Sequence, residues 1–306
     1  MTLAPADERN LIFPLFAGLQ SAEGWDTFLK RLLPRTGATR ICLLQRPNGA
    51  PAIHAFQRDV HASGSTDARH LDVEALEACG LLPLHSLRPN RVYALEEMRA
   101  STDTDAEAAQ LAVMHREGIA HARFVRFLPG TDAEAWLILL HDRKDFVAAD
   151  SALLSSVVPY VALAITTLTQ IMTLQMRATL AEDALAMLGV GQVAFDRQGR
   201  VIAADDIGAA ELAVQPGARP QWRGGHADKL AEVCNELADK PGQTRRLLRY
   251  DERAGKDMLL RPALRVGDNL PRVAAATGLV RRAQREAAAS AARIVAGRLW
   301  PAARGA

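Results

Sequence analysis

Histidine and cysteine side chains are the groups of this chain best suited to metal binding or nucleophilic catalysis. The chain has eight histidines and three cysteines, and Cys42, Cys79 and Cys234 are far apart and form no CxxC or CxxH pair. His115 and His121 lie on either side of a glycine, and no HxxxH or HExxH spacing occurs. Zinc sites are commonly built from closely spaced ligand pairs of these kinds. The sequence therefore predicts no metal site and no cofactor.

Motifs that build hydrolytic or phosphate-binding sites are also missing from the sequence. Gly64-Ser65 does not belong to a GxSxG pattern, and Gly189-Val-Gly191 lacks the third glycine of GxGxxG. A GxxxxGK[ST] loop does not occur. We therefore predict no catalytic residues and a protein that is not an enzyme. The alternative, an enzyme of unrecognised type, would require a pocket with convergent titratable groups.

Aromatic and polar residues on the expected strands are candidates for lining a ligand pocket, because a curved sheet covered by helices leaves space between the two layers. The candidate ligand-binding residues are Tyr93, His121, Arg123 and Trp136 in the first half of the chain and Phe195, Trp222 and Met258 in the second. The alternative is that each of them is an ordinary core or surface residue.

Hydrophobic spacing and turn signals predict the elements that position the first group. Two amphipathic helices are expected within residues 8–35, and further helices at 73–79 and 106–117. Strands are expected at 40–45, 51–56, 91–94, 121–128 and 135–141. Gly118 is expected to end the helix before it. An antiparallel sheet with helices packed on it is an α+β layout.

A helix of unusual length is predicted from about residue 150 to about residue 188. This segment contains one proline and no glycine, and Gly189 follows it. Apolar residues at spacings of four and three form a first stripe of the coiled-coil type. The first stripe comprises Leu154, Val158, Val161, Ile165, Leu168 and Met172. A second stripe then continues on a neighbouring face and comprises Ile171, Leu174, Ala178, Ala181, Leu185 and Leu188. We expect the first stripe to form a homodimer; the alternative is that it packs on its own sheet.

Residues 151–176 carry no charge and are numerous enough to span a bilayer. Serine, threonine and glutamine side chains dilute the hydropathy of this segment, and no strong aromatic or basic flanks border it. The N-terminal residues do not have the pattern of a signal peptide, and three unpaired cysteines suit a reducing compartment. The prediction is a cytoplasmic protein with no membrane span.

The second half of the chain predicts a smaller unit with its own sheet. Strands are expected at 192–195, 200–203, 244–250, 257–262 and 273–279, and helices at 206–213 and 226–238. Asp205 is expected to cap the first of these helices. Two strands, two helices and three strands follow the order of a PAS-type sensor domain.

Three segments resemble the sensory half of LuxR-type helix-turn-helix regulators that contain a GAF-like and a PAS-like domain. They are residues 87–98, the helix-to-hairpin junction 180–203, and residues 258–263 with 276–281. The resemblance implies an α+β fold with two antiparallel-sheet sensor domains, GAF-like then PAS-like, joined by a long α-helix. The expected boundaries are 1–148 for the GAF-like domain, 149–188 for the connecting and dimerisation helix, 189–281 for the PAS-like domain, and 282–306 for a basic C-terminal helix and tail.

The C-terminal segment is strongly basic, although the net charge of the whole chain is only +2. Between Arg281 and Ala306 there are six arginines and one glutamate. Regulators of this type continue into a DNA-binding domain, and the sequence ends too soon after Gly297 for us to expect one here. Candidate DNA contacts, nonspecific in kind, are Arg281, Arg282, Arg285 and Arg293. The alternative is a solvated basic helix end.

Together these patterns predict a non-enzymatic, homodimeric transcription-regulatory protein that senses a signal by binding a small ligand or a partner. Two non-enzymatic alternatives remain. One is a DNA-binding regulator that acts directly through its basic C-terminal helix, and the other is a stand-alone partner-binding protein with no ligand.

Overall fold

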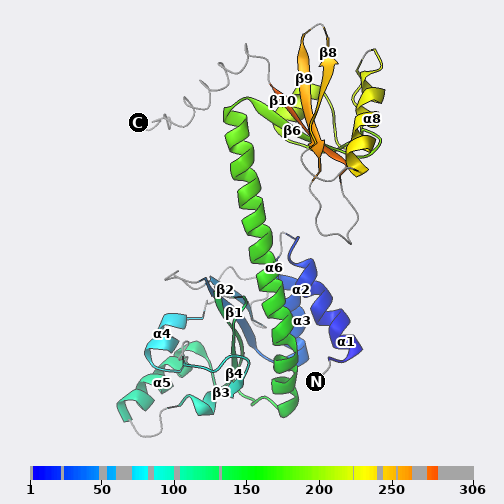
Figure 1. Cartoon of the computed structure of the whole chain (residues 1–306). Helices are drawn as coiled ribbons and strands as arrows, with labels where there is room; N and C mark the ends of the chain where they lie inside the picture. Colours follow the sequence, from blue (N-terminus) through cyan, green and yellow to red (C-terminus); the bar gives the residue numbers. More distant parts are fainter. Residues whose placement is uncertain are drawn as a thin grey trace, which may run out of the picture. The chain divides into compact units, whose positions relative to one another are not determined.

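A computed structural model of the chain (Figure 1) divides into two compact units, Met1–Met172 and Thr173–Ala306, and each is described by itself. The described residues are 3–21, 24–47, 54–59, 71–81, 86–99, 104–130, 133–222, 224–239, 244–252, 254–263 and 274–281.

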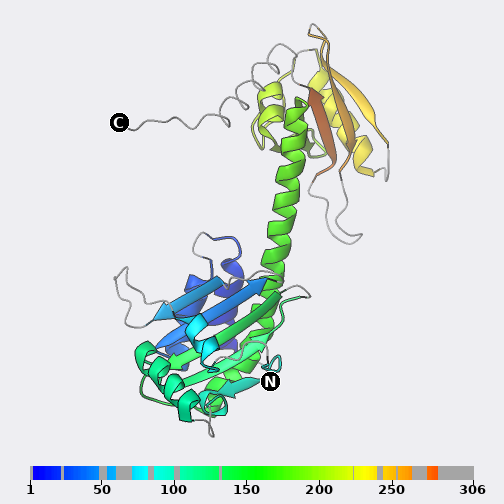
Figure 2. The same cartoon turned by 90° about the vertical axis from the view of Figure 1, so that its left-hand side faces the viewer.

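The first unit is built on a five-stranded antiparallel sheet with the strand order β2-β1-β5-β4-β3. Its strands are β1 (Arg40–Pro47), β2 (His54–Asp59), β3 (Val92–Ala94), β4 (His121–Phe127) and β5 (Ala133–His141). Its helical elements are α1 (Pro5–Asp7), η1 (Glu8–Ile12), α2 (Phe13–Ala17), α3 (Asp26–Thr36), α4 (Val73–Ala78), η2 (Leu95–Glu97), α5 (Thr104–Glu117) and the start of α6 (Ala148–Met187). Figure 2 looks past α4 and α5 onto this sheet, with α6 behind it.

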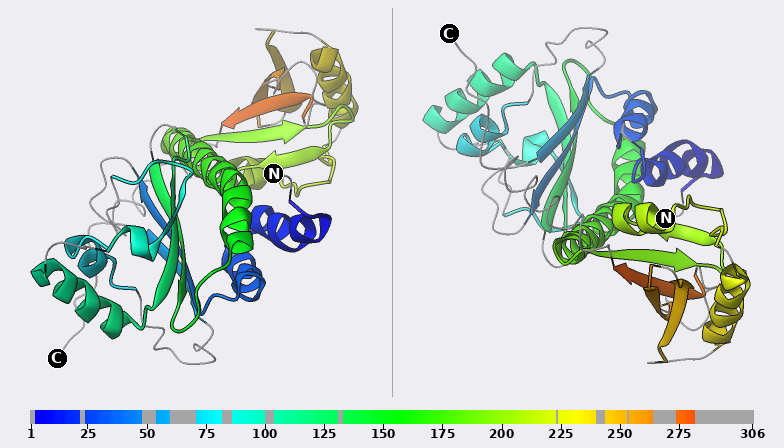
Figure 3. Two further views of the ribbon diagram at one scale, coloured as in Figure 1. Left: turned by 90° about the horizontal axis from the view of Figure 1, so that it is seen from below. Right: turned by 90° about the horizontal axis from the view of Figure 1, so that it is seen from above.

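Helices cover both faces of this sheet, as its edge-on view in Figure 3 shows. Side chains alternate between the two faces along each strand. On the face called here the α6 face, strand residues such as Leu43 and Leu137 pack with Leu32 of α3 and Leu154 of α6. On the opposite face, called the α5 face, residues such as Trp136 pack near α4 and α5. The result is a three-layer α/β/α sandwich with a separate apolar core on each side of the sheet.

Helix α6 is 40 residues long, and it begins in the first unit and ends in the second. Length and composition alone would allow it to cross a membrane. Its first half, however, buries an apolar face in the core on the α6 face of the sheet. The buried residues of α6 are Leu153, Leu154, Val157, Val158, Val161, Ala164 and Ile165. This half of α6 is therefore the core helix of a folded unit.

The second unit has a five-stranded antiparallel sheet with the order β7-β6-β10-β9-β8, the same order as in the first unit when strands are counted within each. Its elements are β6 (Val190–Phe195), β7 (Val201–Ala204), α7 (Asp206–Leu212), α8 (His226–Asp239), β8 (Arg246–Asp251), β9 (Lys256–Pro262) and β10 (Ala276–Arg281). Leu212 of α7 and Leu230 of α8 pack on one face of this sheet.

The predicted α+β class, with two antiparallel sheets and a long helix between them, is confirmed. The predicted order of elements is also observed in both halves. Gly118 adopts a positive φ of 65° directly after α5, as expected for a helix C-terminus. The expected start of the second strand, 51–53, lies outside the described residues.

Candidate functional site

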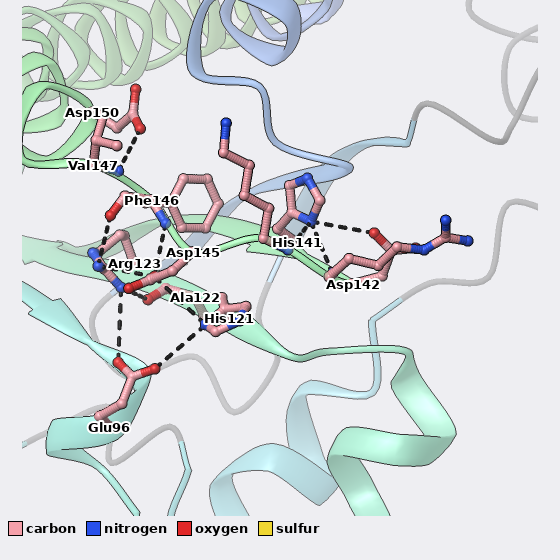
Figure 4. A network of polar contacts seen from close by, with 12 residues as sticks. Glu96, His121, Ala122, Arg123, His141, Asp142, Asp145, Phe146, Val147 and Asp150 are labelled. Atoms are coloured by element: carbon pink, nitrogen blue, oxygen red, sulfur yellow. Dashed lines mark hydrogen bonds and ion pairs between the residues drawn. The ribbon is translucent and has the colours of Figure 1, made fainter.

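A cluster of four charged or titratable side chains lies beside the start of α6 (Figure 4). This polar cluster consists of Glu96, His121, Arg123 and Asp145. His121 and Arg123 are two residues apart on β4, so both side chains point to the same face of the sheet. Glu96 follows β3, whose Ala94 pairs with Arg123, and Asp145 lies between β5 and α6. Three separate segments therefore supply the cluster.

Arg123 is the most buried member of the polar cluster, with 11% of its side chain exposed. Its Nη2 lies 3.0 Å from Asp145 Oδ1 and donates to the Phe146 carbonyl at 3.1 Å. Its Nη1 donates to the Ala122 carbonyl at 2.9 Å and lies 3.9 Å from Glu96 Oε2. Its guanidinium also lies 5.7 Å from the centre of the Phe146 ring, a cation–π contact. Arg123 thus fastens the segment before α6 to β4.

Asp145 completes this attachment from the other side. Burial by itself raises the pKa of the Asp145 carboxyl. Hydrogen bonds from Arg123 and the Phe146 N–H, together with the charges of Arg123 and His121, outweigh this effect, so the pKa is lower than the ordinary value. The Phe146 N–H donates to Asp145 Oδ1 at 2.7 Å. One residue further on, the Val147 N–H donates to Asp150 Oδ2 at 2.9 Å, which satisfies a free donor at the N-terminus of α6. The start of α6 is therefore fixed by side chains.

His121 places its Nδ1 atom between two carboxylates. Nδ1 lies 3.5 Å from Glu96 Oε1 and 3.6 Å from Asp145 Oδ1. The Nδ1 atom is buried and has no hydrogen-bond partner among the described residues. One ligand atom from each of the three residues lies within 4.8 Å of the others, so these residues have the donor types and spacing to hold a metal ion.

Of the four ligand-binding candidates in the first unit, the structure brings together only His121 and Arg123. Tyr93 and Trp136 are buried in the core on the α5 face, 7% and 0% exposed. The Tyr93 hydroxyl accepts a hydrogen bond from the Arg88 N–H at 2.9 Å. The four residues therefore do not line one pocket, because the alternation of β4 turns His121 and Arg123 away from the α5 face.

In the second unit Phe195 and Met258 are fully buried in one core, and both lie beside Gly278. A Cβ atom at Gly278 would lie 3.1 Å from Phe195 Cε2 and 3.0 Å from Met258 Cγ. Trp222 is half-buried, and its ring centre lies 5.2 Å from that of Tyr250. Burial, followed by the charge of Glu211, raises the pKa of Tyr250 above its usual range, and its hydroxyl lies 3.2 Å from Glu211 Oε1. Phe195 and Met258 are therefore core residues and Trp222 packs against the same core, while ligand binding by this unit stays a prediction.

The first stripe of α6 lies mainly inside its own unit. Leu154, Val158, Val161 and Ile165 are at most 1% exposed, Leu168 is half-buried, and Met172 is 59% exposed. The packing matches the alternative in which this stripe contacts its own sheet. The second stripe is open: Leu174 and Leu188 are 64% and 70% exposed. Dimerisation stays a prediction, and the second stripe is the face available for it.

Among the candidate DNA contacts, only Arg281 falls within the described residues. It is exposed and is the last residue of β10, paired with Val190 of β6. Arg282, Arg285 and Arg293, together with the predicted C-terminal helix, lie outside the described residues.

Glu96 and Asp145 are the two members of the polar cluster that sequence reasoning missed. Glu96 belongs to the segment 87–98 that carries the resemblance, and Asp145 shortly precedes the predicted long helix. A carboxylate just before a helix is a recognisable signal. Nothing in the sequence, however, indicates that β3 and β4 are neighbours, and that neighbourhood brings Glu96 to His121.

No protein-family model matches the chain, and no curated protein matches it. Among solved structures, the chain is similar to the VqsR LBD domain from Pseudomonas aeruginosa, with 14% identity over 55% of this chain and 98% of that one and a TM-score of 0.39. It is also similar to the N-acylhomoserine lactone dependent LuxR family transcription factor CepR2 from Burkholderia cenocepacia, with 12% identity over 50% and 90% of the two chains and a TM-score of 0.35. The phycoerythrobilin-bound GAF domain of a cyanobacterial phytochrome gives 13% identity, 56% and 100% coverage and a TM-score of 0.37. All three are weak and distant matches of fold.

Proposed function

We propose that this chain is a non-enzymatic, cytoplasmic signal-sensing regulator of the LuxR type, which works as a homodimer. Its first unit would bind a small ligand or a partner, and α6 would carry the response toward the second unit. The observation that carries this proposal is the construction of α6: one half is the core helix of the first unit, and the other half exposes an apolar stripe.

The polar cluster supports a role for α6 in signalling. Arg123 joins β4 to the residues directly before α6 through Asp145 and the Phe146 carbonyl. A ligand that changes the position of β4 or η2 would therefore change the start of the helix. Because a packed helix has discrete preferred positions, a small displacement at its base can select between two arrangements further along.

The second stripe supports homodimerisation. Ile171, Leu174, Ala178, Ala181, Leu185 and Leu188 are spaced alternately by three and four residues. Such a spacing keeps one side of a helix in contact with a partner helix. All six are exposed or half-exposed in the single chain. A second copy of α6 would remove this apolar surface from water.

The test is the oligomeric state of variants of the full chain. We expect the wild-type protein to be a dimer at micromolar concentration in sedimentation-velocity experiments. Leu174→Glu together with Leu185→Glu should shift it to monomer, because the substitutions place charges in the middle of the contact. The matched control is Met176→Glu, which adds a charge at an exposed apolar residue about 200° around the helix from Leu174, and it should stay dimeric.

Each other outcome has a definite meaning. A wild-type monomer would overturn the dimeric mechanism. Dissociation by Met176→Glu but not by the double variant would show that the opposite face of α6 forms the contact. Salt-sensitive binding of duplex DNA by the wild-type chain would favour the alternative in which the basic C-terminal segment contacts DNA directly.

A further inference from the structure

We propose that Glu96, His121 and Asp145 form a binding site for one divalent transition-metal ion, with zinc as the ion that the donor set fits best. This inference does not depend on the proposed regulatory function. It goes against the expectation from sequence spacing, because the three ligands come from separate segments and form no motif.

The separation of the donor atoms suits tetrahedral zinc. With bonds of about 2.0–2.2 Å, two ligands of a tetrahedral zinc ion are about 3.4 Å apart. His121 Nδ1 lies 3.5 Å from Glu96 Oε1 and 3.6 Å from Asp145 Oδ1. An octahedral magnesium ion, with bonds of about 2.0–2.1 Å, would need neighbouring ligands about 2.9 Å apart. The two separations from His121 therefore match an ion the size of zinc, and the ligand atoms of all three residues lie within 4.8 Å of one another.

The chemistry of the donors also favours a transition metal. An imidazole nitrogen with two carboxylate oxygens suits zinc and related ions, whereas calcium and magnesium prefer oxygen ligands alone. The buried Nδ1 of His121 has no hydrogen-bond partner among the described residues, and a buried polar atom without a partner is unfavourable. Coordination of a cation by its lone pair would satisfy it.

Arg123 has two effects on the site. Its charge offsets part of the charge of the two carboxylates, which lowers the affinity for a cation. Its hydrogen bond to Asp145, together with that of the Phe146 N–H, holds the Asp145 carboxylate in one orientation, as outer-shell partners of metal ligands do. Glu96 faces Arg123 with Oε2 and His121 with Oε1, so one oxygen can bind the ion while the other stays near the guanidinium.

The carboxylate side of the site is open to solvent, whereas His121 Nδ1 itself is buried. The side chains of Glu96, Asp145 and His121 are 52%, 48% and 29% exposed. Three protein ligands leave a fourth tetrahedral position for water or a small anionic group. An ion bound here would join η2 to β4 and to the segment before α6, and would stabilise the first unit against unfolding by mass action.

The test is isothermal titration of the untagged, metal-free full chain with zinc chloride, followed by absorption spectra with cobalt(II). We expect one high-affinity zinc ion per chain, a rise in the melting temperature with zinc, and a cobalt spectrum of tetrahedral nitrogen and oxygen ligation. His121→Ala and Glu96→Gln should each weaken zinc binding by more than about tenfold, because the loss of an outer-shell partner alone usually costs about 10–100-fold in affinity. His115→Ala, an exposed histidine at the end of α5, is the matched control and should bind zinc as the wild type does.

Several results would overturn the proposal. They are the absence of stoichiometric zinc binding by the wild type, unchanged affinity in His121→Ala, and a cobalt spectrum with thiolate charge-transfer bands, which would place the ion on cysteine. If the wild type binds no zinc, the polar cluster is a network of ion pairs and hydrogen bonds around Arg123 and not a metal site. Melting curves without metal check that each variant folds, and His121→Gln replaces the alanine variant if that one does not. The dimer measurement above is independent of every one of these results.

Discussion

Arg123 shows at the scale of a single residue how this fold joins its sheet to its long helix. The side chain is largely buried, yet it meets one carboxylate closely, a second at longer range, two backbone carbonyls and an aromatic ring. A buried guanidinium is tolerated only when its charge and its donors are satisfied. Its partners Asp145 and Phe146 lie just before α6, so the contacts of this one side chain attach the residues before the helix to β4.

The cysteines allow a prediction at the same scale. Cys234 of α8 is buried, and burial raises the pKa of its thiol to about 12. Since the thiolate is the reactive form, Cys234 should not react with a disulfide reagent at pH 8 in the folded protein. Cys42 is also buried, whereas Cys79 is half-buried and should react first. The measurement is the time course of labelling, with modified peptides identified by mass spectrometry.

A single substitution controls for this assignment. Cys79→Ser should remove the fast phase of labelling and leave the slow phase, which reports opening of the two cores. Fast modification of Cys234 in the folded chain would contradict the burial described here.

At the scale of elements, α7 is tied to β6 by one aspartate. Asp205 Oδ1 accepts a hydrogen bond from the Gly208 N–H at 2.7 Å, which is the predicted N-cap. Its Oδ2 accepts a second from the Gln192 N–H at 2.8 Å, which the sequence does not indicate. One carboxylate thus caps the helix and positions it against the strand.

We expect Asp205→Ala to lower the free energy of unfolding by about 1–2 kcal/mol through the lost cap, with an additional loss from the unpaired Gln192 N–H. Asp206→Ala, an exposed acid in the first turn of α7, is the control and should cost less than about 1 kcal/mol. Urea unfolding followed by circular dichroism measures both. Equal losses in the two variants would show that neither the cap nor the link to β6 contributes to stability.

At the scale of the whole molecule, the apolar cores of the two units are made of different residues. Two cores lie on the faces of the first sheet, and a third lies between the second sheet and its helices α7 and α8. Stability in such a chain is held in separate cooperative units. Unfolding should therefore occur in more than one step.

Gly208→Ala tests this separation. An added Cβ would lie 2.6 Å from the Gln192 carbonyl oxygen and 2.7 Å from Val193 Cγ2, and such overpacking costs about 1–3 kcal/mol. Calorimetry and hydrogen exchange should show destabilisation of the second unit alone. Leu137→Ala, in the core on the α6 face, should destabilise the first unit alone. If either variant lowers the stability of both units equally, the chain unfolds as one cooperative body.

The sequence by itself determined the types and order of the elements in both units. Those features depend on neighbours along the chain: the alternation of strand residues, the apolar spacing of α6, the cap at Asp205 and the glycine after α5. The alternation of strand residues also predicts that His121 and Arg123 lie on the same side of a strand, because side chains two residues apart point to the same face.

Tertiary structure alone decided which side chains meet. The order β2-β1-β5-β4-β3 places β3 beside β4, and so brings Glu96 to His121. The tertiary structure also places His121 on the opposite face of the sheet from Tyr93 and Trp136. It buries the first stripe of α6 against its own sheet and leaves the second stripe exposed. A local pattern shows that two residues share a face, but the layer that covers this face is chosen by long-range packing of the whole unit, which local spacing does not encode.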